Sequence, residues 1–446
     1  MLAGAALQNA YAIVNGVWVG QCLGEDALAA VTAGFPVIFV LTSAAMGLTM
    51  AANVLVSQAF GARDIDRVRL VVRNAVVLAM VIGILLLVIG HIATPSLLRA
   101  MNTPPQVFAL SCGYLRVFLF TIPLSFGVFL IAAMLRGVGD STTPLYFQGG
   151  AIIATGILDP ILMFGWLGLP RLELMGTAYA SILAQGVSLL ALVVHVHRSG
   201  HIVAPDWRHL RADRRTTWML LKVGVPIAVQ QTLVSVCVGV VVSLVAQFGS
   251  AAVAAYGACL RIEQLALLPA LTLGMAISTI SGQNIGAGRY DRVREVFRWG
   301  LLLSGGITVV VMALALSAPG LLMRMFIGEP DVIRIGVGYL RIVALGYLCF
   351  ATMFASNGVI NGSGQTFMTT LFTVAALWAV RVPVAVCLSR SLGRVEGVWY
   401  GIVIGFAAGM IISLTYYMSG RWRRSIPVVR PARPATGIAE EQTAAE

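Results

Sequence analysis

The sequence contains few charged residues. Asp, Glu, Lys and Arg make up only 11% of its 446 residues, whereas hydrophobic residues make up 59%, and the mean hydropathy is +0.90. A soluble domain carries roughly 25% charged residues. A chain this apolar cannot hide its hydrophobic surface in a soluble core. The scarcity of charge therefore excludes a soluble globular protein and predicts an all-α polytopic membrane protein.

The sequence also lacks the usual signatures of catalysis and metal binding. His195 and His197 are two residues apart, so they do not share a helix face, and no carboxylate or cysteine completes a ligand set. No phosphate-binding loop, nucleophile elbow or HExxH pattern occurs. The six cysteines show no paired spacing and are expected to be core residues. These absences argue against an enzyme, a metal centre and a disulfide framework.

The net charge of +12 does not indicate a nucleic-acid partner. The arginines lie in loops between apolar runs, where basic residues set the topology of a membrane protein. The first apolar run begins at residue 2 and is too long for a cleavable signal peptide, so it predicts a spanning helix.

Runs of about 20 apolar residues predict twelve spanning helices. Their approximate ranges are 2–22, 28–56, 75–98, 112–135, 144–168, 175–196, 223–248, 252–281, 300–323, 335–360, 367–389 and 397–419.

The chain is an internal duplication with a constant offset of 225 residues. The segment from Ser57 to Arg69 recurs from Gly282 to Arg294, so that Gln58 aligns with Gln283 and Gly61 with Gly286. The same offset relates other matched residues, which are Gly24 and Gly249, Gly113-Tyr-Leu-Arg116 and Gly338-Tyr-Leu-Arg341, and Gly137 and Gly362. Each half has an even number of helices. The halves are therefore expected to be parallel repeats with the same orientation in the membrane.

The predicted organisation is a six-helix lobe at 1–197, an inter-lobe linker at 198–222, a second six-helix lobe at 223–420 and a disordered tail at 421–446. The positive-inside rule places the side richer in basic residues, with both termini, in the cytoplasm. Eighteen basic residues fall on that side, which are Arg63, Arg67, Arg69, Arg73, Arg136, Arg198, Arg208, Arg211, Arg214, Arg215, Lys222, Arg289, Arg292, Arg294, Arg298, Arg421, Arg423 and Arg424. Six fall on the other, which are Arg99, Arg171, Arg324, Arg334, Arg390 and Arg394.

The duplicated segment follows the second helix of each half, on the predicted cytoplasmic side. Its members with a possible role are Gln58, Gly61, Arg67, Gln283, Gly286 and Arg292. One interpretation is a tight turn with a basic topology anchor, since glycine often ends a helix. The other is a contact between the lobes that breaks and reforms during transport.

Asp159 is the strongest candidate for a functional ionisable residue inside the membrane. No other charged residue occurs between Asp140 and Arg171, and an ionisable group at this depth is a functional hypothesis by default. Thr155 lies one turn earlier on the same face, and Pro160 removes a backbone donor. These oxygens could hold Na+, or the carboxylate could bind and release H+; a structural acid at a helix bend is the alternative.

A second polar site is expected around Glu263, which lies two residues after Arg261 and so does not face it. Arg381 and Arg341 are candidate partners. A structural ion pair and a coupling role both fit this pattern.

The chain resembles the multidrug and toxic compound extrusion (MATE) family over almost its whole length. The motifs that carry the resemblance are Gly24-Glu-Asp-Ala-Leu-Ala-Ala30, Val56-Ser-Gln-x-x-Gly-Ala62, Gln283-Asn-Ile-Gly-Ala287, Arg136-Gly-Val-Gly-Asp140, Leu158-Asp-Pro160 and Arg261-Ile-Glu263. The Leu-Asp-Pro pattern is similar to the DinF-like bacterial branch, and this resemblance implies a bacterial inner membrane. The resemblance implies a V-shaped pair of lobes and cation-coupled export of amphipathic compounds by alternating access.

The sequence departs from the family at Asn15, where relatives usually carry an aspartate that belongs to the coupling site with the residue matching Asp159. The chain also begins partway into the first helix of the family. We expect Asp159 to bind the driving cation, with Asn15, Thr155, Thr177 and Ser181 nearby.

The sequence thus predicts a multidrug antiporter for cationic or amphipathic compounds, driven by H+ or Na+ and requiring no other cofactor. Each chain holds both lobes, so a monomer suffices. Two alternatives remain open, which are a flippase for lipid-linked oligosaccharides or precursors and a weakly coupled relative that does not transport.

Overall fold

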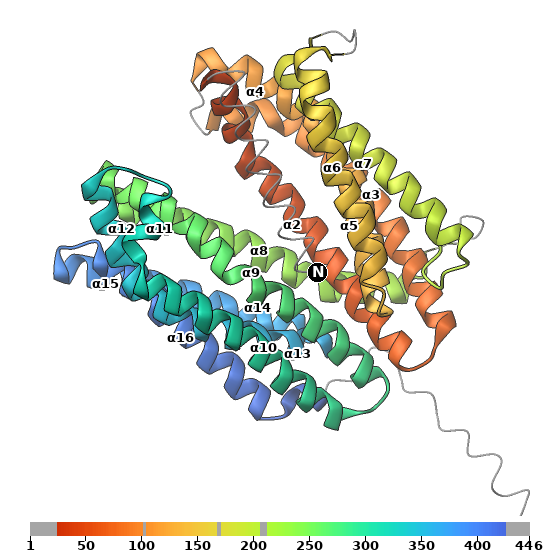
Figure 1. Ribbon diagram of the computed structural model, residues 1–446. Helices are drawn as coiled ribbons and strands as arrows, with labels where there is room; N and C mark the ends of the chain where they lie inside the picture. Colours follow the sequence, from red (N-terminus) through yellow and green to blue (C-terminus); the bar gives the residue numbers. More distant parts are fainter. Residues whose placement is uncertain (1–24, 101–103, 167–170, 206–211, 425–446) are drawn as a thin grey trace, which may run out of the picture.

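A computed structural model of the protein describes residues 25–100, 104–166, 171–205 and 212–424. Within these ranges all regular structure is helical. The helices form two bundles that meet at one end and diverge toward the other (Figure 1). We call these bundles the first and second lobe, and we call the end where they meet the joined end.

The first lobe contains six helices in the described residues. They are α2 (Glu25–Gly61), α3 (Ile65–Ala100), α4 (Pro105–Phe118), α5 (Thr121–Gly137), α6 (Thr142–Phe164) and α7 (Glu173–Arg198). The break between α4 and α5 bends one predicted span by 40°.

The second lobe runs from α8 to α16. Its helices are α8 (Arg214–Ala246), α9 (Ser250–Gly286), α10 (Tyr290–Ser317), α11 (Pro319–Arg324), α12 (Pro330–Val343), α13 (Tyr347–Gly362), α14 (Thr366–Val374), α15 (Val382–Leu392) and α16 (Glu396–Met418). A 3₁₀ turn, η3 (Ala344–Gly346), joins α12 to α13, and a π-helical segment, η4 (Ala375–Arg381), joins α14 to α15.

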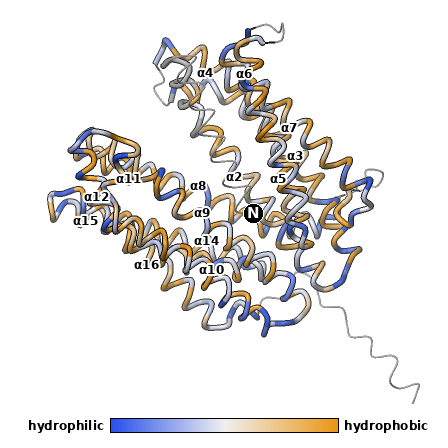
Figure 2. Tube along the Cα trace, viewed as in Figure 1, coloured by the Kyte–Doolittle hydropathy of each residue, from blue (hydrophilic) through white to orange (hydrophobic). Residues whose placement is uncertain are grey.

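These helices make the chain a multi-pass membrane protein. In the described residues, ten helices are long and apolar enough to cross a membrane, or eleven if the bent pair α4–α5 counts as one span. They match the eleven spans predicted after residue 25, and the span predicted at 2–22 lies outside the described residues. Hydrophilic residues gather at the helix ends and turns, and apolar residues cover the long middle sections (Figure 2).

The duplication is confirmed in the helix boundaries. Glu25–Gly61 and Ser250–Gly286 begin and end 225 residues apart, and so do Pro105–Phe118 and Pro330–Val343. The lobes differ where α6 is one continuous helix and its counterpart is interrupted by η4.

Two predicted boundaries were wrong. The span predicted at 300–323 ends at Ser317, because Pro319 begins a separate short helix. Helix α8 begins at Arg214, within the predicted linker at 198–222, because Asp213 caps it by accepting a hydrogen bond from the Thr216 backbone N–H at 2.8 Å. Hydrogen bonds from Thr216 hold the pKa of Asp213 below its usual range. Of the predicted tail, only 421–424 lies within the described residues.

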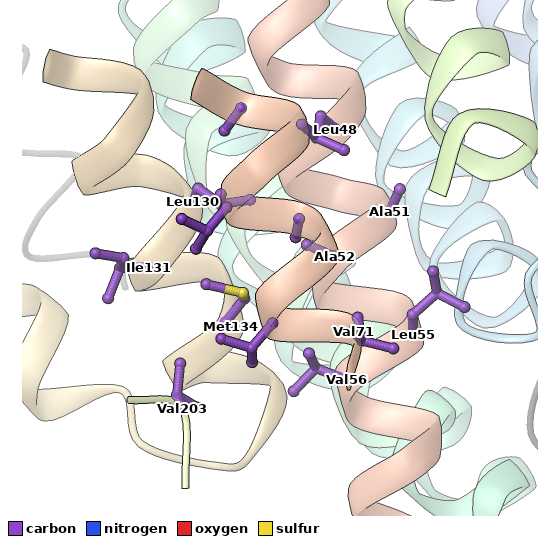
Figure 3. Close-up of a cluster of buried hydrophobic side chains, with 14 of the residues drawn as sticks. Leu48, Ala51, Ala52, Leu55, Val56, Val71, Leu130, Ile131, Met134 and Val203 are labelled. Carbon is purple, nitrogen blue, oxygen red and sulfur yellow. The ribbon is translucent and has the colours of Figure 1, made fainter. Parts of the chain in front are cut away.

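A hydrophobic cluster fixes the joined end of the first lobe (Figure 3). Leu55 and Val56 of α2 pack with Val71 of α3 and with Leu130 and Met134 of α5, and all five side chains are buried. Because α2 also contacts the second lobe, this packing holds the contact surface in place.

Close packing of α6 on α7 depends on Gly176. A Cβ atom at this position would lie 2.7 Å from the Leu162 backbone carbon and 2.8 Å from the Met163 backbone nitrogen. Both are backbone atoms of a helix, so they cannot shift away from an added side chain as the end of a flexible side chain can. The Gly176→Val variant should therefore be overpacked and lose about 1–3 kcal/mol of stability.

Thermal unfolding in detergent measures this loss. Gly150→Val is the matched control, because a Cβ atom at Gly150 on α6 meets nothing within 4 Å. Equal melting temperatures for the two variants would contradict the packing account.

Candidate functional site

The duplicated segment forms a reciprocal contact between the lobes at the joined end. The Gln58 side-chain amide donates to the Gly362 carbonyl of the second lobe at 2.8 Å. The Gln283 side-chain amide donates to the Gly137 carbonyl of the first lobe at 2.9 Å. Both the donors and the acceptors are 225 residues apart, so the contact has the pseudo-two-fold symmetry of the duplication.

Gly61 and Gly286 allow the helices to approach at this contact. A Cβ atom on Gly61 would lie 1.9 Å from the Gln283 carbonyl oxygen, and one on Gly286 would lie 2.0 Å from the Gln58 carbonyl oxygen. Any side chain here would clash with the backbone of the opposite lobe. We use the name crossing for the contact made by Gln58, Gly61, Gln283 and Gly286 with the acceptor carbonyls of Gly137 and Gly362.

Further inter-lobe hydrogen bonds lie along α2. The Thr279 hydroxyl of α9 donates to the Asn53 side-chain oxygen of α2 at 2.9 Å, and the Asn53 amide donates to the Ala133 carbonyl at 2.8 Å. Farther from the crossing, the hydroxyls of Ser43 and Thr232 lie 3.1 Å apart. The lobes are thus joined along α2 mainly by neutral hydrogen bonds, which can exchange with water when they separate.

Arg67 and Arg292, which are equivalent arginines of the duplicated segment, lie beside the crossing. Arg67 is half-buried, with its guanidinium 3.5 Å from the Met219 sulfur of the second lobe. Arg292 is exposed and lines an open pocket together with Gly61 and Gly286. Within the described residues, neither arginine donates a hydrogen bond across the crossing glycines. The glutamines and glycines make this contact, and the arginines flank it.

The first-lobe site centres on Asp159 of α6, which is buried with 1% of its surface exposed. Thr155 and Thr177 are buried with it, and the Thr155 hydroxyl donates to the Ala151 carbonyl of its own helix at 2.7 Å. The Thr177 hydroxyl donates to the Leu174 carbonyl at 2.9 Å.

Tyr114 of α4 completes this site, and the sequence prediction did not include it. Its side chain contacts Thr177 and lies within electrostatic range of Asp159. The signal was present, since Tyr114 belongs to the repeated Gly-Tyr-Leu-Arg motif. The site therefore draws on three helices of one lobe, α4, α6 and α7.

The roles predicted for the residues of this site stay predictions. Ser181 of α7 is half-buried. Asn15 lies outside the described residues. Helix α6 continues through Pro160 to Phe164, so no break in the helix occurs there.

The second-lobe prediction is partly corrected. Glu263 is buried in α9, and the Tyr339 hydroxyl donates to its carboxylate. Arg381 is buried nearby and interacts electrostatically with Glu263, yet among the ion pairs of the described residues no salt bridge joins them. Arg261 and Arg341 are exposed. A tyrosine, and not an arginine, is thus the direct partner of the acid, because a buried carboxylate can be satisfied by a neutral donor.

Known proteins are similar to this chain over most of its length. The MatE family model matches residues 1–164 and 226–387. The probable multidrug resistance protein YoeA of Bacillus subtilis is 33% identical, over 94% of this chain and 91% of YoeA. The probable multidrug resistance protein NorM of Thermotoga maritima is 27% identical, over 95% of this chain and 91% of NorM.

Solved structures of MATE proteins have the same fold. A crystal structure of a MATE protein in the straight conformation aligns with a TM-score of 0.89 at 22% identity, covering 95% of each chain. A crystal structure in the bent conformation aligns with a TM-score of 0.87 at 23% identity, covering 100% of this chain and 95% of the other. With the matched family model and the YoeA similarity, these findings show that the chain belongs to the MatE family, the MATE transporters, and is not an enzyme.

Proposed function

We propose that this protein is a secondary active multidrug exporter that exchanges cationic or amphipathic organic compounds for H+ or Na+. The observation that carries the proposal is the crossing, which joins two equivalent lobes at one end through contacts that can separate. The relatives YoeA, NorM and MepA support the substrate class, since their names describe multidrug resistance or export. The DinF-like branch expected from the sequence stays a prediction.

The joined end faces the cytoplasm in this proposal. The crossing lies on the side that carries eighteen of the basic residues counted in the loops, against six on the other side. The positive-inside rule assigns that side, and both termini, to the cytoplasm of a bacterial inner membrane. The conformation described here is then outward-open, and breaking the crossing gives the inward-open state.

Asp159 supplies the coupling in this proposal. A driving ion shifts the balance between two conformations only if it binds them unequally. Binding of H+ or Na+ neutralises a carboxylate packed between α4, α6 and α7, so it changes the interactions among these helices. The change reaches the crossing through α2, which packs on α4 and α5 in the same lobe. Coupling free energies of this kind are about 1–3 kcal/mol.

The Asp159→Asn variant tests this role. It removes the ionisable group and keeps the shape, so efflux of ethidium driven by an imposed gradient should fall by about tenfold or more, the equivalent of ~1.4 kcal/mol of coupling. Reconstituted vesicles with either a pH gradient or a Na+ gradient measure the effect, and the gradient that drives wild-type efflux identifies the ion.

Asp291→Asn is the matched control, because Asp291 is exposed in the first turn of α10. Gradient-driven efflux that persists in Asp159→Asn would remove Asp159 from the coupling mechanism. Absence of ethidium efflux from folded wild-type protein with either gradient would favour the alternative of a flippase for lipid-linked precursors.

A second prediction concerns the crossing. The double variant Gln58→Ala, Gln283→Ala removes both reciprocal hydrogen bonds, each worth about 1 kcal/mol, and should favour separation of the lobes at the joined end about tenfold or more. Spin labels at the exposed positions Arg69 and Arg294 report the distance between the lobes by pulsed electron resonance in a cysteine-free background.

Asn284→Ala provides the control. Asn284 lies next to Gln283, but its amide donates to the Ile280 carbonyl of its own helix at 2.8 Å. The control should leave the distance distribution unchanged, while the double variant should populate longer distances. Identical distributions in both variants would show that the glutamines do not hold the lobes together.

A further inference from the structure

The second lobe contains a buried acid and tyrosine that resemble the pair in the first lobe. The Tyr339 hydroxyl donates to the Glu263 carboxylate, and the exposed fractions of these residues are 0% and 7%. Tyr339 is the counterpart of Tyr114 under the 225-residue offset, and Tyr114 lies within electrostatic range of Asp159. The repeated tyrosine therefore lies beside a buried acid in both lobes.

The two acids themselves are not related by the duplication. Asp159 belongs to α6, whereas Glu263 belongs to α9, the counterpart of α2. Under the offset, Ile38 matches Glu263 and Val384 matches Asp159. In each lobe an acid thus lies beside the equivalent tyrosine, but the two acids come from helices that are not equivalent. The duplication alone does not account for this arrangement, because the acids occupy positions that are not equivalent under the offset.

Aromatic side chains enclose Glu263. The Tyr256 ring of α9 stacks on the Trp399 ring of α16 with centroids 5.5 Å apart, and the Tyr339 ring meets Trp399 edge-on at 4.8 Å. Tyr256 and Tyr339 also meet edge-on, at 5.8 Å. Tyr347 of α13 lies within electrostatic range of Glu263. All four rings are fully buried, with at most 1% exposed.

Several polar atoms of this enclosure have no hydrogen-bond partner among the described residues. They are the hydroxyls of Tyr256 and Tyr347, the indole N–H of Trp399 and the Nε–H of Arg381. Buried polar groups are normally paired, so a cluster of unpaired groups around one acid needs an explanation. A change in the protonation of Glu263 is one explanation, because the ionised and the protonated carboxyl group require different hydrogen-bond partners.

Arg381 is held near Glu263 without forming a salt bridge. The π-helical segment η4 ends at Arg381, and the Arg381 guanidinium lies 5.6 Å from the centre of the Phe406 ring. A Cβ atom at Gly405 would lie 2.7 Å from the Arg381 Cβ, so the glycine admits the arginine stem. Single π-helical turns often occur at functional sites. A fixed positive charge thus lies near the acid but leaves its oxygens available.

We propose that Glu263, with Tyr339 as its donor, is a second proton-binding site of the transporter, located in the second lobe. This proposal rests on the proposed exporter function, and it adds a second coupling group to Asp159. The ionised acid accepts from Tyr339. The protonated acid keeps that bond, because its carbonyl oxygen still accepts from the Tyr339 hydroxyl.

The lining favours H+ over Na+. A bound Na+ requires several oxygen ligands and is repelled by a neighbouring guanidinium, whereas a proton requires only the carboxylate. The titratable and charged groups around Glu263 are Cys259 and Tyr256 on α9, Tyr339 on α12, Tyr347 on α13 and Arg381 on η4, with Cys237 on α8 beside Arg381. Proton binding changes the net charge of the Glu263 and Arg381 pair from zero to +1.

The first test measures proton binding without any substrate. Infrared difference spectra of the purified full-length protein, recorded as the pH is changed, report the carbonyl band of a buried protonated carboxylic acid. In an Asp159→Asn background we expect one such band, and we expect Glu263→Gln to abolish it. Glu329→Gln is the control, because Glu329 is exposed. A band that survives Glu263→Gln would overturn the proposal.

The second test counts protons during binding of ethidium. Calorimetry in buffers of different ionisation enthalpy gives the number of protons released for each ethidium bound. Glu263→Gln and Asp159→Asn should each halve this number, and the double variant should release none. An unchanged number in Glu263→Gln would overturn the second site.

The Tyr339→Phe variant distinguishes a role in proton binding from a purely structural effect of Glu263→Gln. It keeps the carboxyl group and removes its donor, so the band should persist and its midpoint pH should move. A band with an unchanged midpoint would contradict the role of Tyr339. If ethidium does not bind to the wild type, the proposed exporter function fails, and the infrared test of Glu263 still stands.

Discussion

The whole arrangement depends on the close approach of α2 and α9 at the crossing. Two glycines bring each helix against the backbone of the other lobe, and two glutamines donate to carbonyls on opposite sides. Neutral hydrogen bonds contribute only about 0.5–1.5 kcal/mol each. A contact of this strength holds the two lobes together, and its hydrogen bonds cost little free energy to break. A set of buried ion pairs here would cost several kcal/mol to desolvate and break.

In the proposed mechanism, the buried acids are the groups that bind the driving cation. Asp159 lies between three helices of the first lobe, and Glu263 lies in an aromatic enclosure of the second. Each acid neighbours its lobe's copy of the repeated tyrosine, Tyr114 or Tyr339, although the acids come from helices that are not equivalent. The duplication therefore supplies a symmetric scaffold and crossing, while the ionisable groups make the lobes chemically unequal. Unequal lobes can bind cations at different stages of one cycle.

The sequence predicted the fold and most of the crossing, because hydropathy and a constant offset depend only on residue order. It identified Asp159 because a lone charge in a long apolar run is conspicuous. It did not predict that Gln58 reaches the Gly362 carbonyl, since that contact joins residues about 300 positions apart. It also named arginines as partners of Glu263. The contact of Tyr339 with the acid joins two helices, and Arg381 lies at the end of a π-helical segment, and residue order alone predicts neither feature.

The central claim is that ion binding to the buried acids controls separation at the crossing. Pulsed electron resonance between labels at positions 69 and 294, recorded in the cysteine-free background with no further substitution over a range of pH and Na+ concentrations, tests it most directly. The account predicts a short and a long distance whose populations exchange as one of the two ions is varied. A single distance under every condition would contradict it.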